Sequence, residues 1–468
     1  MSGRLVTPGR TVRERTAAAV ADPVLQDALA NLTRRLRTAT DLARTRPDLR
    51  DAAARIRRET LTDLDTWIAR LTEALETTGA RVHHAADAAA AAEIVVGIAR
   101  SAGARRVTKS KSMATEEIGL ADALAAAGIE PVETDLGEYA VQVAGERPSH
   151  IITPVIHKTV AGVAATFRTR TGERVPSDPA GITGWVRDRL RPRFTDAPVS
   201  ITGANFAVAE TGTLVLVTNE GNADLGTACA PVQVAVVPVE KVVPRFADLA
   251  VLLPLLTGAA TGQHLTAYVT LLHGPRRAAE RDGPQALHVV LLDNGRRRLL
   301  GTRYAEMLAC IRCGACLNVC PVFRRVSGHA YDATYTGPMG AVLTPLLSRG
   351  AEGAELPWAS SLCGACSEAC PVSIPLADLL VHLRADLRGG DPVRPRRRWR
   401  ARTGLAGAWA TVWSRPRGYR ASLRLAAPAL RLLRRLPGGP GAGRDLPAVS
   451  GSTFGARWRA RAEGRARW

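Results

Sequence analysis

The chain has 468 residues, of which 46% are hydrophobic, and a formal net charge of +20 at pH 7. This length corresponds to two or three domains of a soluble protein, and no segment reaches the roughly 18 uncharged apolar residues that a membrane span needs. The first residues lack the apolar core of a secretory signal peptide. We therefore expect a cytoplasmic protein without a transmembrane segment.

The positive charge is concentrated in the carboxyl-terminal tail. Residues 391–468 contain 19 arginines and three acidic residues, so they contribute +16, and the other 390 residues contribute only +4. Arginine outnumbers lysine 59 to 4 in the whole chain, a bias that is typical of a GC-rich genome. The arginine-rich tail is therefore weak evidence for nucleic-acid binding.

The first half of the chain shows two successive patterns. Residues 1–78 are expected to form an N-terminal helical segment, because apolar residues recur at three- and four-residue spacing, with a break at Pro47. From residue 80 onward, short apolar runs alternate with alanine-rich stretches. The expected strands are residues 80–85, 105–110 and 129–135, and the expected helices are residues 87–103 and 115–128. This alternation predicts a mostly parallel sheet covered by helices.

Residues 199–243 contain further β-rich runs, which turn dipeptides such as Thr211-Gly212 and Glu220-Gly221 separate. They belong to the same α/β domain, which we expect to cover residues 79–297. Asn294-Gly295 and the arginine run 296–298 are expected to be a linker. Residues 298–390 then form a cysteine-rich domain. Residues 391–468 form an Arg-rich tail with two short helices and a Gly/Pro-rich break at 437–443.

Seven of the eight cysteines lie close together in the sequence, which in a reducing compartment indicates metal binding rather than disulfides. The first run is Cys310-x2-Cys313-x2-Cys316-x3-Cys320-Pro321. In bacterial ferredoxins with this spacing, three thiolates hold one [4Fe-4S] cluster and the fourth serves the neighbouring cluster. Gly314 would let the backbone approach the inorganic sulfides.

The second run is Cys363-x2-Cys366-x3-Cys370-Pro371, and Ser360 stands where its first cysteine would be. The ferredoxin rule then assigns Cys310, Cys313, Cys316 and Cys370 to cluster 1, and Cys320, Cys363 and Cys366 to cluster 2. Cluster 2 is one ligand short. Its fourth iron could take Ser360, water or a group from a partner, the cluster could be of the [3Fe-4S] type, or Cys229 could reach it. Cys229 is otherwise expected to be a buried, inert thiol.

Zinc is the alternative metal, because C-x2-C pairs also build tetrahedral zinc sites. Three closely spaced cysteines and two Cys-Pro endings fit zinc poorly and iron–sulfur clusters well. The 42 residues between Cys320 and Cys363 are too many for a compact β-containing ferredoxin and indicate a helical one. Residues 340–349 and 374–390 are the expected helices.

These residues resemble the lactate utilization protein B family. The resemblance is carried by CIRCGACLNVCPVFRRVSGHAY, YTGPMG and SSLCGACSEACPVSIPL, and in the α/β part by VTKSKSMATEEIG, ETDLGEYAVQVAGERPSHII and ITGANFAVAETGTLVLVTNEGNA. It implies an α/β domain of the sugar-isomerase/CoA-transferase-like fold with N-terminal helices, followed by an α-helical ferredoxin domain. It also implies an electron carrier that works with two other lactate-utilization subunits in the oxidation of L-lactate to pyruvate. A missing cysteine at Ser360 belongs to the family pattern.

Other residues are weaker candidates for a site. Lys109 and Lys111 follow an expected strand, where α/β sheets bind ligands, so they could bind an anion or lie in a solvated loop. Glu210 could act as a carboxylate nucleophile, although its Thr-Gly neighbours are ordinary turn formers. His150 and His157 have no cysteine or carboxylate at ligand spacing, which favours a structural role. The absence of GxGxxG and P-loop strings gives no reason to expect a nucleotide.

Three functions compete at this point. The first is an electron-transfer subunit of a lactate-oxidising complex, which is not a catalyst by itself. The second is an enzyme whose α/β domain binds and converts an organic acid or CoA ester, with auxiliary clusters. The third is an iron–sulfur regulator that binds nucleic acid through the tail, but the sequence has no helix-turn-helix or aromatic stacking pattern. The cysteine spacing itself indicates only electron transfer.

Overall fold

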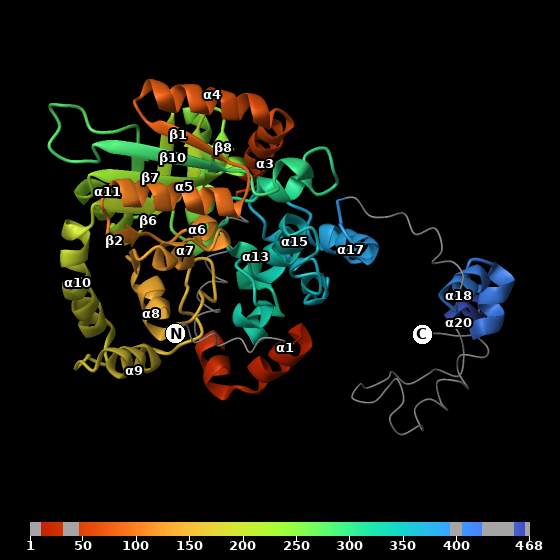
Figure 1. Ribbon diagram of the computed structural model, residues 1–468. Helices are drawn as coiled ribbons and strands as arrows, with labels where there is room; N and C mark the ends of the chain where they lie inside the picture. Colours follow the sequence, from red (N-terminus) through yellow and green to blue (C-terminus); the bar gives the residue numbers. More distant parts are fainter. Residues whose placement is uncertain (1–10, 31–45, 394–404, 424–453, 464–468) are drawn as a thin grey trace. The chain divides into compact units, whose positions relative to one another are not determined.

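The computed structural model describes residues 11–30, 46–393, 405–423 and 454–463 (Figure 1). Residues 1–395 and residues 396–468 form two compact units. The second unit includes the helices α18 (Leu405–Trp413) and α20 (Phe454–Ala462), whereas the break predicted at 437–443 lies outside the described residues. Within the described ranges, no helix is long and apolar enough to cross a membrane.

The helices α1 (Val12–Ala21), α3 (Pro47–Thr62) and α4 (Leu64–Thr77) precede the first strand, and residues 23–30 are also helical. A capping box starts α1, because the Thr11 hydroxyl accepts from the Glu14 N–H and the Glu14 carboxylate accepts from the Thr11 N–H. Pro47 starts α3 with a backbone angle that suits the first helical turn. The helical prediction is confirmed for these segments, and residues 31–45 lie outside the described part.

The centre of the first unit is a six-stranded sheet in the order β1-β10-β7-β4-β2-β3, and every neighbouring pair is parallel. Its strands are β1 (Arg81–Ala85), β2 (Arg106–Lys109), β3 (Glu130–Glu133), β4 (Val199–Thr202), β7 (Val232–Pro238) and β10 (Ala286–Leu292). The inner strands β4, β7 and β10 are buried along almost their whole length, because helices and loops cover both faces of the sheet. The predicted parallel sheet is confirmed.

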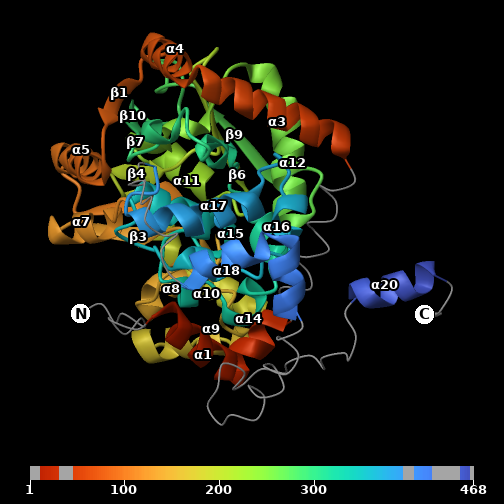
Figure 2. The ribbon, with the colours of Figure 1, turned by 90° about the vertical axis from the view of Figure 1, so that its right-hand side faces the viewer.

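Helices between the strands cover this sheet (Figures 1 and 2). They are α5 (Ala88–Ser101), α6 (Met113–Glu117), α7 (Leu120–Ala126), α8 (Leu136–Ala144), α9 (Val160–Thr171), α10 (Pro179–Asp196) and α11 (Asn222–Cys229). In α5, Ala91, Val95 and Ala99 recur every four residues and are fully buried in one apolar core with the sheet residue Val107. α8, α9 and α10 share a second core around Phe167.

A second, four-stranded sheet has the order β8-β5-β6-β9. Its strands are β5 (Phe206–Val208), β6 (Thr213–Thr218), β8 (Val242–Val243) and β9 (Tyr268–Leu272), and α12 (Leu249–Thr261) follows β8. The predicted strands at 199–243 are therefore confirmed but are divided between two sheets. Gly212 in the β5–β6 turn has φ +66°, and a Cβ there would lie 2.7 Å from the Ala74 backbone, so only glycine lets α4 approach this turn.

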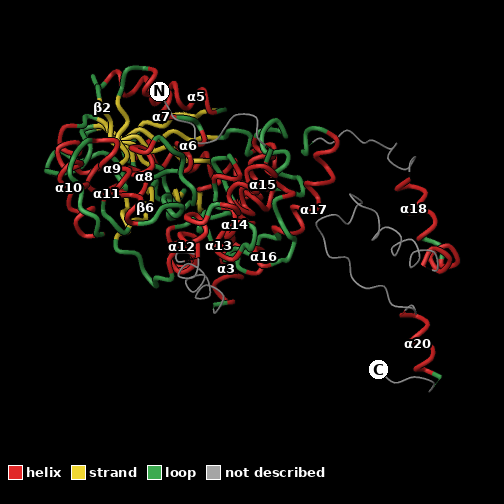
Figure 3. The backbone as a smooth tube through the Cα atoms, turned by 90° about the horizontal axis from the view of Figure 1, so that it is seen from below, coloured by secondary structure: helices red, strands yellow, loops and turns green. Residues whose placement is uncertain are grey.

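The cysteine-rich segment is helical, as predicted. Its α-helices are α13 (Ala315–Val319), α14 (Phe323–Val326), α15 (Gly337–Leu347), α16 (Ala365–Glu368) and α17 (Leu376–Asp386). These helices lie together beside the strands (Figure 3). Ile311 and Leu317 share one continuous apolar core with Val237 and Leu291 of the parallel sheet, so this segment packs directly on the α/β part.

Candidate iron–sulfur site

The two cysteine runs fold into loops with the same backbone. Arg312 and Leu362, which each precede a cysteine, have φ of +62° and +55°. Gly314 and Gly364, which follow those cysteines, have φ of +78° and +83° and start α13 and α16. Positive φ is unfavourable for residues with a Cβ, so both loops hold strain at the same point. The two loops therefore share the same signs of φ at these positions and the same helix start.

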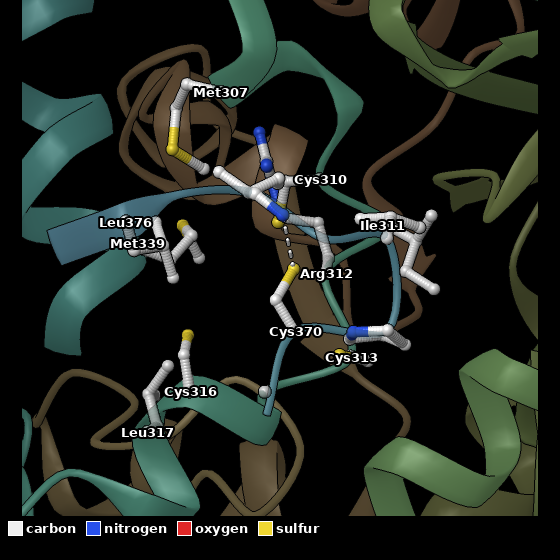
Figure 4. Close-up of a pocket in the computed structure, with 14 residues that line it drawn as sticks. Met307, Cys310, Ile311, Arg312, Cys313, Cys316, Leu317, Met339, Cys370 and Leu376 are labelled. Carbon is white, nitrogen blue, oxygen red and sulfur yellow. Dashed lines mark hydrogen bonds between the residues drawn. The ribbon is translucent and has the colours of Figure 1, made fainter. Parts of the chain in front are cut away.

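Four cysteine side chains of the two loops line one cavity (Figure 4). They are Cys310, Cys313, Cys316 and Cys370. The rest of the lining is mostly apolar and includes Met307, Met339 and Ile374. Burial raises the pKa of Cys313 and Cys316, and the neighbouring cysteines raise it further. Thiols with such neighbours stay protonated unless a metal group replaces the protons.

The other three cysteines of the runs form a second group. Cys320 and Cys366 are buried, whereas Cys363 is exposed. Burial raises the pKa of Cys366 to about 11, with Cys320 and Cys363 as the charged neighbours. In contrast, the Ala365 N–H and the Ser361 side chain lower the pKa of Cys363. The charge of Cys366 also raises the pKa of Cys316, and α13 packs against α16. The two groups of cysteines are therefore adjacent.

The sulfur atoms receive hydrogen bonds from the backbone. The Phe323 N–H donates to Cys320 Sγ at 3.5 Å, and the Ile374 N–H donates to Cys370 Sγ at 3.4 Å. Each donor lies three or four residues after its cysteine, beyond a Cys-Pro pair. N–H donors to cysteine sulfur are characteristic of iron–sulfur sites, where they favour the reduced state.

The residues present suit iron–sulfur clusters in their donor chemistry. Iron–sulfur clusters take thiolate ligands, and the two runs supply seven cysteine sulfurs. The apolar walls and the backbone N–H groups provide the surroundings that such clusters typically have. Among the described residues, no three His, Cys, Asp or Glu side chains have the spacing of a site for a single metal ion. The four cavity cysteines instead surround a shared space.

A loop of the α/β part covers the first cysteine loop. A Cβ on Gly314 would lie 2.9 Å from Ile151 Cγ2 and 3.2 Å from Ile152 Cγ1. The base of the covering loop is clamped, because the Glu146 carboxylate accepts hydrogen bonds at 2.6 Å from both His157 Nε2 and Lys158 Nζ. Burial opposes ionisation of Glu146, but these two donors outweigh burial and lower its pKa to about 2.

His150 holds the tip of this covering loop. Its Nδ1 accepts hydrogen bonds from the N–H groups of Ile152 and Thr153, and its Nε2 lies 3.0 Å from Asn318 Oδ1 in α13. Burial lowers the pKa of His150 to about 4, so the ring is neutral. The predicted structural roles of His150 and His157 agree with these contacts.

Buried charges join the sheet to the cysteine loop. Arg296, which is fully buried, makes a bidentate pair with Glu117 at 2.7 and 2.8 Å and a hydrogen bond to Glu240 at 2.5 Å. The other Glu240 oxygen accepts from Arg312 at 2.9 Å, and Arg312 lies 4.9 Å from the Tyr335 ring centre. Burial would raise the pKa of Glu117, but Arg296 outweighs burial and lowers it. Glu240 follows β7 and reaches the cysteine loop through Arg312, whereas Glu117 ends α6 and holds Arg296.

Family models match both parts of the chain. Residues 68–292 match the LUD domain, and residues 306–374 match the 4Fe-4S dicluster domain. Lactate utilization protein B of Oceanobacillus iheyensis is 43% identical over 426 residues, which cover 89% of this chain and 88% of the relative. The protein of the same name from Bacillus thuringiensis is 47% identical over 352 residues, which cover 75% and 74%.

The chain belongs to the lactate utilization protein B family. The dicluster match implies iron–sulfur clusters in this part of the chain, where the cysteines at 310–370 lie close together in the sequence. A crystal structure of a DUF162 family protein from Deinococcus radiodurans covers 49% of the chain and 98% of its own chain, with 16% identity and a TM-score of 0.24. That similarity is too low to establish the fold.

Two residues considered as the missing ligand of cluster 2 differ in position. Ser360 precedes the second loop, where its Oγ accepts from the Leu362 N–H at 3.1 Å and its carbonyl accepts from Arg384 at 3.0 Å. Cys229 ends α11, which packs on β2, β4 and β6. Cys229 is half-buried, whereas a buried thiol was expected. It precedes β7 (Val232–Pro238), and Glu240, which contacts the first cysteine loop through Arg312, lies after the opposite end of that strand. The structure therefore does not bring Cys229 to the seven cysteines.

The two lysines considered either as an anion site or as part of a solvated loop are already paired, and Lys109 is buried at the end of β2. Lys109 is buried and its Nζ lies 2.6 Å from Glu133 Oε1 and 2.8 Å from Glu116 Oε1. Lys111 donates to the Ile152 carbonyl at 2.9 Å and lies 3.6 Å from Asp135. Lys109 is thus committed to carboxylates, and Lys111 anchors the loop that covers Gly314.

Glu210 lies on the exposed turn between β5 and β6. Its carboxylate accepts a hydrogen bond at 2.8 Å from the Phe246 N–H, which precedes α12. This contact gives Glu210 a role in joining two loops, and Glu210 is not among the residues of the cysteine cavity. Asn222, at the start of α11, donates to Thr134 at 3.0 Å.

Sequence reasoning missed the buried ion network. Arg296 was expected in a linker, but it is fully buried. Arg57, also fully buried, donates to the carbonyls of Val242 at 2.8 Å and of Leu308 at 3.2 Å. One sequence feature could have indicated this network: Arg312 lies between Cys310 and Cys313. A charged side chain that is buried beside these cysteines needs a counter-ion from elsewhere in the chain.

Proposed function

We propose that this chain carries two [4Fe-4S] clusters and transfers electrons in the oxidation of L-lactate to pyruvate. Cluster 1 would be held by the four cysteines of the cavity, Cys310, Cys313, Cys316 and Cys370, and cluster 2 by Cys320, Cys363 and Cys366. The proposal depends on one observation. Cys370 of the second run lines the same cavity as Cys310, Cys313 and Cys316 of the first run, although it is distant from them in the sequence. The names of the relatives support the link to lactate.

When bound, each cluster would accept and release one electron at a time. The chain supplies the surroundings. Met307, Met339 and Ile374 exclude water from the cavity, and N–H groups such as that of Ile374 stabilise negative charge on sulfur. The adjacency of Cys366 to Cys316 supports short-range exchange between the two sites.

The second group of cysteines is the better candidate for contact with a redox partner. Cys363 is exposed, and Trp358 and Val381 nearby in sequence are 47% and 50% exposed. The three-cysteine set supports either an open iron corner, for which Ser360 or water is the candidate ligand, or a [3Fe-4S] cluster. The partners would be two other lactate-utilization subunits. The protein would act in the cytoplasm.

The α/β part would have the sugar-isomerase/CoA-transferase-like fold. The parallel six-stranded sheet with helices on both sides is compatible with that fold. Lys109 is buried among carboxylates, which supports a structural rather than a catalytic part for this edge of the sheet. We therefore favour an electron-transfer subunit over a catalyst that acts alone.

Anaerobic iron and acid-labile sulfide analysis, combined with EPR of the dithionite-reduced protein, tests the proposal. We expect seven to eight iron atoms per chain, as the assigned ligand sets require, and signals of two reducible clusters. Zinc without acid-labile sulfide would refute it. The purified chain should also fail to turn over lactate with an artificial acceptor unless the partner subunits are added. Turnover by the chain alone would favour the enzyme alternative.

A further inference from the structure

The tail that contains the second compact unit carries most of the net positive charge. A preference for arginine over lysine does not explain this charge, because residues 1–390 balance 44 basic residues with 40 acidic ones, whereas residues 391–468 have 19 arginines and three acidic residues. The described parts of this unit, 405–423 and 454–463, contain six arginines and one acidic residue, Glu463. The unit therefore suits a negatively charged partner.

The helix α18 presents an aromatic face. Trp409, Val412 and Trp413 recur at three- and four-residue spacing, so they lie on one side of this helix. The Trp409 and Trp413 ring centres lie 4.8 Å apart, and the Tyr419 ring centre lies 5.1 Å from that of Trp413. Trp409 is 56% exposed, and the other three side chains are also exposed. A cluster of large apolar side chains thus faces solvent.

Basic residues follow this face directly in the sequence. Residues 405–414 contain no charged residue, whereas Arg415, Arg417 and Arg420 follow within six positions. All three arginines are exposed. An uncharged aromatic segment and a cluster of positive charge therefore lie next to each other in the second unit.

The helix α20 combines the same two kinds of side chain. Phe454 and Trp458 lie one turn apart, their ring centres are 5.8 Å apart, and both side chains are exposed. Arg457 and Arg461 are also one turn apart, and the helical period places them beside the two aromatic residues. Both helices of the unit therefore place arginines next to exposed aromatic rings.

We propose that α18 and α20 bind the surface of a membrane that contains anionic lipids. Tryptophan and tyrosine are favourable at the boundary between headgroups and acyl chains, because their rings are apolar and their N–H or O–H groups stay hydrated. Arginines beside them attract the lipid phosphates. Each helix has nine residues, which is too short to cross a bilayer, so the helices lie along its surface. This inference goes beyond the proposed function and does not need the clusters.

Nucleic acid is the other polyanion that the charge could attract. Sites for single-stranded nucleic acid offer aromatic rings on which the bases stack. In α18, however, the rings of Trp409 and Trp413 pack against each other, and Val412, which has no ring, completes the exposed face. A continuous apolar face of this kind matches a lipid layer better than separate bases.

The test is co-sedimentation of the full chain with lipid vesicles. We expect vesicles with about one third phosphatidylglycerol to bind it at least about tenfold more tightly than vesicles of pure phosphatidylcholine, and we expect added salt to weaken the binding. The variant Trp409→Ala/Trp413→Ala should bind the anionic vesicles at least about tenfold more weakly, because the apolar contact is lost. Trp358→Ala, which changes an exposed tryptophan of the first unit, is the matched control and should bind as wild type does.

The contribution of charge is tested separately at Arg415, Arg417 and Arg420. Glutamine at these three positions should weaken binding to anionic vesicles at least about tenfold. Lysine at the same positions should restore most of the binding, because a charged membrane surface attracts either cation, and this recovery excludes loss of folding as the cause. The matched control replaces three exposed arginines of the first unit by glutamine and should bind as wild type does. These arginines are Arg55, Arg100 and Arg105.

Several results would overturn the inference: no binding to anionic vesicles, equal binding to neutral ones, or unchanged binding of the tryptophan variant or of the glutamine variant. Tail-dependent binding of an RNA oligonucleotide by a chain that ignores the vesicles would assign the tail to nucleic acid, which also overturns it. The iron content of the same preparation reports on the proposed function separately, because a chain without clusters refutes that function and leaves the vesicle result valid.

Discussion

The first and second cysteine loops have the same backbone but opposite surroundings. Gly314 and Gly364 have φ of +78° and +83° and each start a short helix. However, three side chains of the α/β part lie within 3.5 Å of a Cβ built on Gly314, whereas nothing lies within 4 Å of one built on Gly364. The local sequence CGAC therefore determines the loop, and distant segments determine whether it is covered.

This difference assigns distinct tasks to the two loops. The covered loop lies against buried charges from the sheet, whereas the second loop presents Cys363 to solvent. Burial keeps water away from a site and strengthens its electrostatic interactions with nearby charged residues, whereas exposure allows contact with another molecule. Each of the following experiments compares the same change in the two loops, or the effect of removing the cover.

The largest effect is expected from removing ligands. Cys316→Ala deletes a buried cysteine next to both groups, so we expect it to lose about half of the bound iron or more. Cys363→Ala removes an exposed ligand of the second group alone and should leave cluster 1 loaded. Iron and sulfide analysis with EPR measures this difference. Loss of the same EPR signal in the two variants would contradict the assignment of ligands.

Alanine at the two glycines comes next. Positive φ should cost about 1–2 kcal/mol at either position. Gly314→Ala should cost about 2–4 kcal/mol in total, because the added Cβ overlaps Ile151. Urea unfolding of the two variants measures the gap. If Gly364→Ala were equally destabilising, the cover over Gly314 would not differ from the surroundings of Gly364.

Acid should loosen the cover of the first loop. The pKa of Glu146 is about 2, against 4.5 in the unfolded chain, so its contribution is complete above pH 4.5 and is lost as the pH falls toward 2. We expect the ionised Glu146 to contribute up to about 2 kcal/mol to the free energy of unfolding, after allowing for solvent screening. The stability difference between wild type and Glu146→Gln in urea should shrink as the pH falls from 6 to 3. A constant difference would show that the clamp is not ionic.

The smallest perturbation is chemical labelling of the chain after removal of its clusters. The thiol of Cys363 is exposed, and the Ala365 N–H and Ser361 lower its pKa. We expect it to react with iodoacetamide at least about tenfold faster than Cys316, whose burial raises its pKa. Peptide mass spectrometry at short times measures the two rates. Faster labelling of Cys316 would contradict the burial of the first loop.

Cysteine spacing predicted more of the site than of its surroundings. Cys370, 50 residues after Cys320 in the sequence, was grouped with the first run by the ferredoxin rule, and the cavity brings it there. The parallel sheet also followed from local alternation of apolar runs. In contrast, the pairing of β5 with β8 and the burial of Arg296 depend on contacts between distant residues, which leave no periodic pattern in the sequence.

The Arg312–Glu240 pair has a consequence for protein engineering. The guanidinium comes from the cysteine loop, but its counter-ion comes from the segment after β7. A cysteine segment excised at its apparent boundary would carry a buried cation without its anion, which typically costs several kcal/mol. Chimeras between relatives should therefore exchange the residues at 240 and 312 together, even though 71 residues separate them in the sequence.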